Sequence, residues 1–191
     1  MSHSFYVVPF AVLWLGWFTY WMVAARNMKA TRRREPITTF LLNRVFVVIG
    51  VLLVVFPHLL PQWLAGSFIV PGMVSYAIGL IMVAAGLGFS VWARVYLGRN
   101  WSAVVTIKQD HELVRGGPYG LVRHPIYSGL LFALLGTAVA IGQWRGLVAF
   151  AAITVGFLIK MRVEERFMDE SFGEQYARYR REVAALIPFM L

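Results

Sequence analysis

The sequence contains no cysteine and little charge. The absence of cysteine among 191 residues excludes disulfides, thiolate metal sites and cysteine nucleophiles. Only 14% of the residues are charged, and Val45 to Ala93 contains no Asp, Glu, Lys or Arg. A stretch of that length accommodates two membrane spans of about 20 residues each with a short connection. With 59% apolar residues and a mean hydropathy of +0.66, the sequence predicts an integral membrane protein.

Acidic residues are scarce and unevenly distributed. The chain has nine of them against 18 Lys and Arg, and all acidic residues except Glu35 follow residue 109. We therefore expect a single domain over residues 1–191. Residues 1–93 would form a three-span scaffold, and residues 94–191 would form the catalytic half.

Apolar runs predict an all-α, polytopic protein with about five transmembrane helices. The first run is too long for the apolar core of a signal peptide, so it is interpreted as a retained span. The last two runs are short and only four residues apart, which predicts a C-terminal helical hairpin. The runs are Phe5–Ala25, Ile37–Leu60, Gly72–Ala93, Ile126–Ile141 and Gly146–Ile159.

Two further patterns occur within these spans. Ser75/Gly79 and Ala84/Gly88 are pairs of small residues four apart, which suits close contact between helices. The first span carries three tryptophans, which we interpret as interface anchors and packing residues rather than as a ligand cage. They are Trp14, Trp17 and Trp21.

The cations indicate an orientation. Arg26–Arg44, Arg94–Arg123 and Lys160–Arg181 hold 17 of the 18 Lys and Arg, and only Arg145 lies elsewhere. With five spans these three segments share one side, which the positive-inside rule makes cytoplasmic. The net charge of +9 is thus explained by topology and by contact with anionic membrane lipid, so we expect no nucleic-acid partner. We expect a multi-pass protein of the cytoplasmic membrane, with its pocket facing the cytoplasm.

The predicted hairpin brings two polar stretches together. Its turn centres near Gln143–Trp144, so counting equally in both directions pairs Tyr127 with about Lys160 and Arg123 with about Glu164. Pro125 suits the first turn of a helix and biases His124 towards extended backbone. The helix would then begin with free N–H groups beside two cations, a favourable seat for an anion.

Structural alternatives remain open at these residues. Arg123 and Glu164 suit an ion pair that locks the hairpin as well as they suit a ligand site. Glu164 and Glu165 cannot both face one pocket, because neighbouring residues on a helix point roughly 100° apart. Gly116–Pro118 is typical of a turn and is also compatible with a ligand cradle.

An ordered set of motifs resembles the isoprenylcysteine carboxyl methyltransferase family, with phospholipid N-methyltransferases as wider relatives. The set extends over about half of the chain, and a shorter RHPxYxG motif is shared with sterol reductases. The matching residues are Asn100–Ser102, His111–Val114, Gly117–Tyr119, Arg123–Gly129, Glu164–Glu165, Phe172–Tyr176, Tyr179 and Ile187–Pro188.

This resemblance implies S-adenosylmethionine at the cytoplasmic mouth and a lipid-like small-molecule acceptor that enters from the bilayer. It implies catalytic roles for Glu164, Arg123 and Tyr127, acceptor binding by Lys160 and Arg162, and no metal. Lys160 stands where eukaryotic members carry an arginine, and Ala103 replaces a histidine, so the resemblance supports the reaction more strongly than the prenylcysteine acceptor. The implied cofactor-binding residues are Lys108, His111, Glu112, Leu113, Val114, Gly117, Tyr119, His124, Pro125, Ile126, Tyr127, Glu164 and Glu165.

The cations of the site favour an anionic acceptor. A carboxylate is already ionised at neutral pH and needs a cation such as Lys160 or Arg162 to hold it. An amine must lose a proton, for which Glu165 and His124 are the candidate bases. Two alternatives to a methyltransferase remain: an NADPH-dependent membrane lipid reductase and a non-catalytic membrane scaffold. No obligate protein partner is expected.

Overall fold

The computed structural model describes residues 3–26, 31–34, 36–98, 101, 106–108 and 113–190; at residues 3–6, 31–34, 59 and 106–108 it describes the backbone only. Four helices are long and apolar enough to cross a membrane, and a fifth apolar helix is shorter, which confirms the polytopic all-α prediction. The helices are α1 (His3–Ala24), α2 (Ile37–Val55), α3 (Met73–Leu97), α4 (Pro125–Ile141, the shorter one), α5 (Trp144–Phe172) and α6 (Glu174–Glu182).

The C-terminal hairpin has the predicted turn. α4 begins at Pro125 with His124 as its N-cap (φ −122°, ψ 60°), and it ends at Gly142, whose φ is +66°. α5 starts two residues later and continues unbroken to Phe172. Its apolar part therefore extends directly into the charged residues 160–165, which the apolar run alone had not included.

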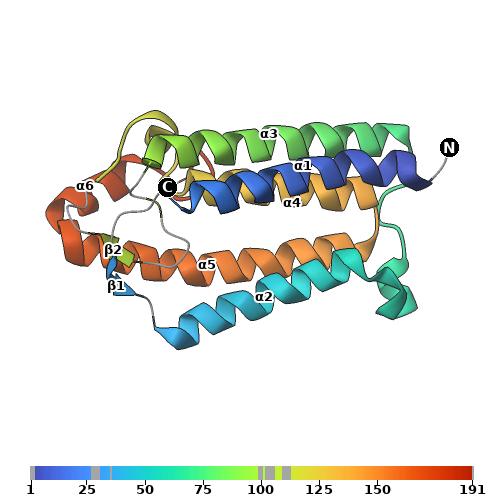
Figure 1. The fold of residues 1–191 in the computed structure, drawn as a ribbon, viewed down its shortest axis with the longest axis horizontal. Coiled ribbons are helices and arrows are strands. Elements are labelled where there is room, and N and C mark those ends of the chain that lie inside the picture. Colours follow the sequence, from blue (N-terminus) through green and yellow to red (C-terminus); the bar gives the residue numbers. More distant parts are fainter. Residues whose placement is uncertain are drawn as a thin grey trace.

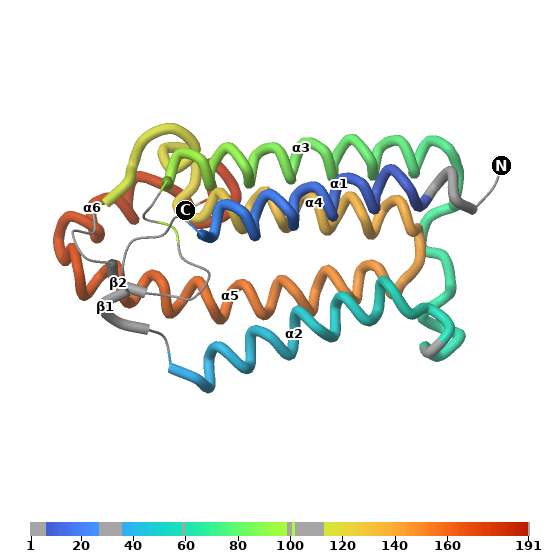
Figure 2. The backbone as a smooth tube through the Cα atoms, in the orientation of Figure 1, coloured from blue at the N-terminus to red at the C-terminus, as the bar shows by residue number. Residues whose placement is uncertain are grey.

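The chain passes back and forth along one axis (Figure 2). α1, α3 and α5 run in one direction, and α2 and α4 run in the other (Figure 1). The α1–α2 and α3–α4 connections, together with α6, lie at one end of the bundle. The described residues of the cation-rich segments belong to this end, whereas Arg145 lies in the first turn of α5 at the other end.

The helices form two groups (Figure 1). α3 packs most extensively on α4, with α1 beside them, and α2 packs on α5. Glycine permits the α3–α4 contact: a Cβ added at Gly79 would lie 2.5 Å from the carbonyl oxygen of Gly136, and one at Gly129 would lie 2.5 Å from that of Gly86. The prediction for Ala84/Gly88 is wrong, because a Cβ at Gly88 would meet nothing within 4 Å. The glycines that form the α3–α4 contact are seven residues apart on each helix, Gly79 and Gly86 on α3 and Gly129 and Gly136 on α4. Seven residues make two turns and therefore lie on one helix face.

Tryptophan side chains attach α1 to the first group. Trp17 Nε1 donates to Ser90 Oγ of α3 at 2.8 Å, and Trp14 Nε1 donates to Thr137 Oγ1 of α4 at 3.2 Å. Each hydroxyl also donates to a carbonyl oxygen of its own helix, so it is the indole N–H groups that would lack a partner without these bonds. The packing role predicted for these residues is confirmed.

Arg145 closes the far end of the second group. Its Nη1 donates to the carbonyl oxygens of Val54 (2.6 Å) and Leu53 (3.2 Å) in the last turn of α2. A cation there satisfies carbonyls that lack helical partners and opposes the negative end of the helix dipole. This contact accounts for a cation on the side that otherwise has few.

Two short strands are an exception to the all-α prediction. β1 (Thr31–Arg34) pairs antiparallel with β2 (Thr106–Lys108). Within the described part of the chain there are also three single turns of 3-10 helix: η1 (Pro57–Leu59) and η2 (Gln62–Ala65) between α2 and α3, and η4 (Gly117–Gly120) before α4.

Candidate active site in the cavity between the helix pairs

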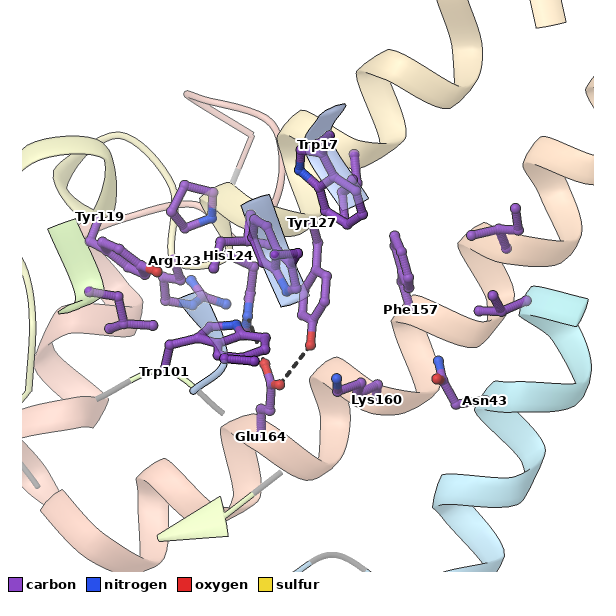
Figure 3. Close-up of a pocket in the computed structure, with 18 of the residues that line it drawn as sticks. Trp17, Asn43, Trp101, Tyr119, Arg123, His124, Tyr127, Phe157, Lys160 and Glu164 are labelled. Atoms are coloured by element: carbon purple, nitrogen blue, oxygen red, sulfur yellow. Dashed lines mark hydrogen bonds and ion pairs between the residues drawn. The ribbon is translucent and has the colours of Figure 1, made fainter. Parts of the chain in front are cut away.

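A cavity of about 650 Å³ lies between the two groups of helices. Its walls come mainly from α1, α2, α4 and α5 and from the segment before α4, with contributions from the end of α3 and from α6, and most of its lining is apolar. Glu164, Lys160, Tyr127, His124 and Tyr119 supply polar groups on one side (Figure 3). A largely apolar pocket with a few convergent polar groups is the usual form of a small-molecule site.

Glu164 is the cavity's carboxylate. Tyr127 Oη donates to Glu164 Oε1 at 2.6 Å, and His124 Nδ1 lies 3.5 Å from Oε2. Figure 3 shows this group with Glu164 on α5 facing Tyr127 on α4. Because two rings hold it from the opposite helix, the carboxylate has a fixed position at the cavity wall.

Arg123 forms an ion pair with Glu165, and not with Glu164 as the hairpin count predicted. Its Nε and Nη2 donate to Glu165 Oε1 at 3.0 and 2.9 Å. The count was off by one position because α4 and α5 do not run in perfect register. Glu165 is absent from the cavity lining. Of the two neighbouring carboxylates, Glu164 therefore faces the cavity and Glu165 forms the ion pair that joins α5 to the start of α4, as helix geometry requires.

The segment after α6 holds the start of α4, a contact that the sequence analysis missed. The backbone N–H groups of Arg123 and His124 donate to the carbonyl oxygens of Ala184 (2.8 Å) and Ala185 (3.0 Å). Ser128 Oγ donates to Leu186 O at 2.6 Å. The Arg123 guanidinium also donates to Val183 O and, at 3.1 Å, to Arg180 O. These bonds, together with Glu165, engage the Arg123 guanidinium that was expected to seat an anion.

His124 lies between the two carboxylates and is buried. Its Nε2 is 3.2 Å from Glu165 Oε1, while Nδ1 faces Glu164. Burial lowers the pKa of His124, but hydrogen bonds and charge from Glu164 and Glu165 outweigh burial, so the pKa is raised above its usual value. The imidazolium form thus joins both carboxylates at once.

Tyr119 lines the cavity from η4 and is held from behind. Tyr179 Oη donates to Tyr119 O at 2.6 Å, and the pKa of Tyr179 is raised to about 12, chiefly by burial. Burial and then the nearby charge of Glu164 raise the pKa of Tyr119 well above its ordinary value. Its hydroxyl therefore keeps its proton at neutral pH and can act as a hydrogen-bond donor.

Only one of the two cations predicted to bind the acceptor lies at the cavity. Lys160 lines the cavity, with Nζ 5.8 Å from the centroid of the Tyr127 ring. Arg162 is exposed and is not among the cavity-lining residues. Two residues along a helix point about 200° apart, so both cannot face one cavity. Arg44 of α2, which the sequence analysis left out of the site, also lines the cavity.

α1 and α2 contribute directly to the cavity, so the division into scaffold and catalytic half is incomplete. Trp14, Trp17 and Trp21 line it, although the sequence analysis gave them no role at a ligand site. Trp21 packs edge-on against Trp101, another lining residue, with ring centroids 5.4 Å apart. The four-residue spacing of Trp17 and Trp21 indicated one helix face, but not what that face meets.

The other predicted cofactor-binding residues lie in several places. Val114, Pro125 and Ile126 line the cavity, whereas Leu113 does not. Gly117, also outside the lining, has φ +56°, and a Cβ there would lie 2.6 Å from the Tyr96 ring, which favours the turn interpretation. His111, Glu112 and the side chain of Lys108 lie outside the described residues.

The charge pattern fits a cationic methyl donor. A carboxylate beside aromatic rings attracts an ammonium or a sulfonium, and the ring faces add cation–π stabilisation. Among the described residues, no group of three or more His, Asp and Glu could hold a metal ion.

Comparisons with known proteins agree with this geometry. The family model described as "Phospholipid methyltransferase" matches residues 74–175. Protein-S-isoprenylcysteine O-methyltransferase A of Arabidopsis thaliana is 33% identical over 72% of this chain and 66% of its own length. A probable protein-S-isoprenylcysteine O-methyltransferase of Oryza sativa subsp. indica is 32% identical over 83% of this chain and 84% of its own.

A solved structure resembles the fold as well. The eukaryotic intramembrane Ras methyltransferase, an isoprenylcysteine carboxyl methyltransferase, matches with a TM-score of 0.51 and 26% identity. The match covers 81% of this chain and 54% of that one, so this chain spans about half the length of the solved relative. The matched family model covers more than half of this chain. The chain therefore belongs to the phospholipid methyltransferase family and, within it, to the isoprenylcysteine carboxyl methyltransferases, a family of membrane methyltransferases.

Proposed function

We propose that this protein transfers a methyl group from S-adenosylmethionine to the carboxylate of an isoprenyl-type or similarly lipid-like acceptor. The supporting observation is the order of groups along one wall of the cavity. Glu164 and Lys160, one helical turn apart on α5, are followed by the apolar Phe157 and Ile153. An anion, a cation and an apolar surface in sequence suit a cationic donor, an anionic head group and a lipid tail.

Glu164 is the residue proposed to hold the donor. Tyr127 and His124 fix its carboxylate, so its position requires little reorganisation when a ligand arrives. Tyr119 and the backbone around His124–Tyr127 would bound the same end of the cavity, as the family resemblance implies. When bound, the donor supplies a methyl group on a positively charged sulfur.

Lys160 is the residue proposed to hold the acceptor's carboxylate. In the transfer, the bond from sulfur to methyl breaks and a bond from carboxylate oxygen to methyl forms. Sulfur keeps the electron pair and becomes a neutral thioether, and no proton has to leave. The protein then has to align the two partners and exclude water, which the aromatic and apolar lining favours.

The contacts of the candidate bases support a carboxylate over an amine as the acceptor. An amine must shed a proton, and Glu165 and His124 were the candidates to take it. Glu165 is paired with Arg123 and His124. His124 contacts both Glu164 and Glu165, and these carboxylates raise its pKa and favour its protonated form. A carboxylate acceptor needs neither group.

The cation-rich end of the bundle would face the cytoplasm. The positive-inside rule gives this orientation, and it exposes the polar end of the cavity to soluble S-adenosylmethionine while apolar walls extend between the helices. The curated relatives carry names that specify an isoprenylated cysteine. For this chain the proposed acceptor class is broader: a molecule with an anionic head group and an apolar tail.

Calorimetry with S-adenosylhomocysteine, the product of the donor, tests the proposal on purified full-length protein in detergent. We expect binding to wild-type protein, and a loss of affinity of about tenfold or more in Glu164→Gln because the variant lacks the charge that faces the cationic donor. Glu174→Gln is the matched control, since Glu174 is an exposed carboxylate paired with Arg181. Absence of binding to a folded wild-type sample would refute the proposed donor.

The acceptor is tested separately, with a labelled methyl donor and a membrane lipid extract. We expect label in a product that releases methanol on mild base treatment, the behaviour of a methyl ester. Label that resists base and remains on an amine head group would contradict the carboxylate assignment while leaving the donor assignment intact.

A further inference from the structure

Asn43 is a polar side chain on α2, the helix without a predicted role in the reaction. It is 9% exposed, and it lines the cavity. Its Nδ2 donates to the carbonyl oxygen of Gly156 on α5 at 2.8 Å. Because that carbonyl only accepts, the orientation of the amide is fixed, with the nitrogen towards α5.

The carbonyl oxygen of the same amide makes no such bond to a described residue. Asn43 Oδ1 has no hydrogen-bond partner among the described residues, and it is not one of their fully covered unpaired atoms. It therefore keeps some accessible surface, and Asn43 lines the cavity. A largely buried amide oxygen is normally paired, because leaving it without a partner costs free energy.

Asn43 is placed beside the cation proposed to hold the acceptor. Gly156, its partner, is one helical turn before Lys160 on α5. Figure 3 shows Asn43 on α2 and Lys160 on α5 close to one another along the cavity. A Cβ at Gly156 would lie 3.3 Å from Asn43 Nδ2 and 3.1 Å from Phe46 Cβ, so the missing side chain allows the amide to reach this position.

Arg44 is the other polar residue of α2 in the cavity lining, and apolar residues continue the wall beyond it. Val47 and Val51 follow on the cavity side of α2, and Phe157 and Ile153 face them from α5. An acceptor with its apolar tail among these residues would place its head group between Lys160 and Asn43. The hydrogen-bond acceptor Oδ1 then faces a part of the head group other than the reacting carboxylate.

We infer that Asn43 determines acceptor specificity: its Oδ1 accepts a hydrogen bond from an N–H or O–H group adjacent to the acceptor's carboxylate. The amide N–H of an acylated amino acid, one carbon from the carboxylate, has this chemistry. An acceptor without such a donor would leave Oδ1 unpaired in the complex and would be methylated less efficiently. The inference rests on the proposed function, and it adds the second polar group of the substrate.

The test compares two acceptors that differ in this group. N-acetyl-S-farnesylcysteine carries the N–H, and S-farnesyl-3-mercaptopropionate lacks the acetamido group. With full-length protein in lipid nanodiscs, we expect wild-type kcat/KM to favour the first about tenfold, the usual magnitude for one hydrogen bond to an otherwise unpaired group. Asn43→Leu should reduce this ratio to about one and change kcat/KM for the second acceptor by less than about twofold.

Gly50→Ala is the control for helix packing. Its Cβ would press on Ile153 at the same α2–α5 contact without meeting Asn43, so the ratio should stay near the wild-type value. If Asn43→Leu does not fold, Asn43→Ala replaces it, because it also removes Oδ1 and should also lower the ratio.

Three results would overturn the inference. They are a wild-type ratio of one, an equal loss for both acceptors in Asn43→Leu, and a loss of the ratio in Gly50→Ala. Transfer to neither acceptor by wild-type protein that binds S-adenosylhomocysteine would instead reject this acceptor class, and the role of Asn43 with it.

Discussion

α4 makes two contacts of opposite character. Along its length it meets α3 through Gly129, Ala133 and Gly136, which bring the two backbones together with almost no side chain between them. At and just before its N-terminal end, Arg123, His124 and Tyr127 contact α5 through ion pairs and hydrogen bonds, beside a ring contact between Tyr127 and Phe157. The α3–α4 contact requires residues with little or no side chain, whereas the α4–α5 contact requires a partner for each polar group.

The difference explains how one helix both holds the fold and builds the site. Between apolar helices in a bilayer, close approach gains dispersion energy that lipid would not supply as well. Charged groups at low dielectric lose free energy unless each is paired. The α4–α5 contact therefore tolerates few changes of chemistry, and the α3–α4 contact tolerates few changes of volume.

Removing one charge from the α4–α5 contact should produce the largest effect. Glu165→Gln leaves the partly buried Arg123 guanidinium without its carboxylate, and we expect a loss of about 2–3 kcal/mol in the free energy of unfolding, at or below the lower end for a fully buried pair. Thermal unfolding in detergent measures it. Glu164→Gln should destabilise less and weaken donor binding more. Equal effects of the two variants on both properties would mean that the carboxylates do not divide between lock and cavity.

A single methyl group tests the α3–α4 contact. Gly86→Ala places a Cβ against the backbone of Gly129 and should cost about 1–3 kcal/mol, as overpacking usually does. Gly88→Ala is the matched control on the same helix, because its Cβ would meet nothing within 4 Å. Gly88→Ala should leave the midpoint unchanged or raise it, since alanine favours helix. Equal midpoints for the two variants would contradict the described packing.

Substitution of Lys160 should affect the acceptor and spare the donor. Lys160→Met keeps the volume of the side chain and removes the charge, so we expect KM for a carboxylate acceptor to rise about tenfold, as loss of one charge-assisted contact predicts. The Kd for S-adenosylhomocysteine should stay within about twofold. Arg162→Met is the control because Arg162 is exposed outside the cavity. A larger loss with Arg162→Met would reverse the assignment of the two cations.

The smallest effect is a dependence of stability on pH. The folded pKa of His124 is raised, so its contribution is fully present below the unfolded pKa of about 6.5. That contribution is lost as pH rises through the higher folded value. Wild-type protein should therefore lose part of its stability between pH of about 6.5 and mildly alkaline pH, and His124→Gln should lose less over that range. A variant with the wild-type slope would assign the dependence to another group.

The candidate site was predictable where local rules decide. Pro125 has no N–H and suits the first turn of a helix, so the start of α4 followed from the sequence. The turn after Ile141 followed from the Gly-Gln-Trp-Arg break between two apolar runs. Those two points were sufficient to bring Tyr127 towards Lys160 and Glu164, with an error of one residue for Arg123.

Contacts between distant segments could not be predicted in the same way. Ala184, Ala185 and Leu186 hold the start of α4 through their carbonyl oxygens, and a backbone acceptor leaves no mark in the sequence. Trp17 and Trp21 had a clear helical spacing, but whether that face met lipid, protein or a cavity depended on where α2 lay. The sequence around Asn43 did not indicate its partner, because Gly156 lies opposite it only through the packing of α5 on α2.

The sequence by itself therefore determined the membrane spans, their orientation relative to the cations, and the α4–α5 hairpin, because hydropathy, charge and proline act locally along the chain. Tertiary structure alone decided which of Glu164 and Glu165 faces the cavity, how Arg123 is engaged, and that α1 and α2 form part of the cavity wall. These outcomes depend on rotations and offsets of a few ångströms between helices. Such offsets are set by the sum of many side-chain contacts and are not encoded at any one position.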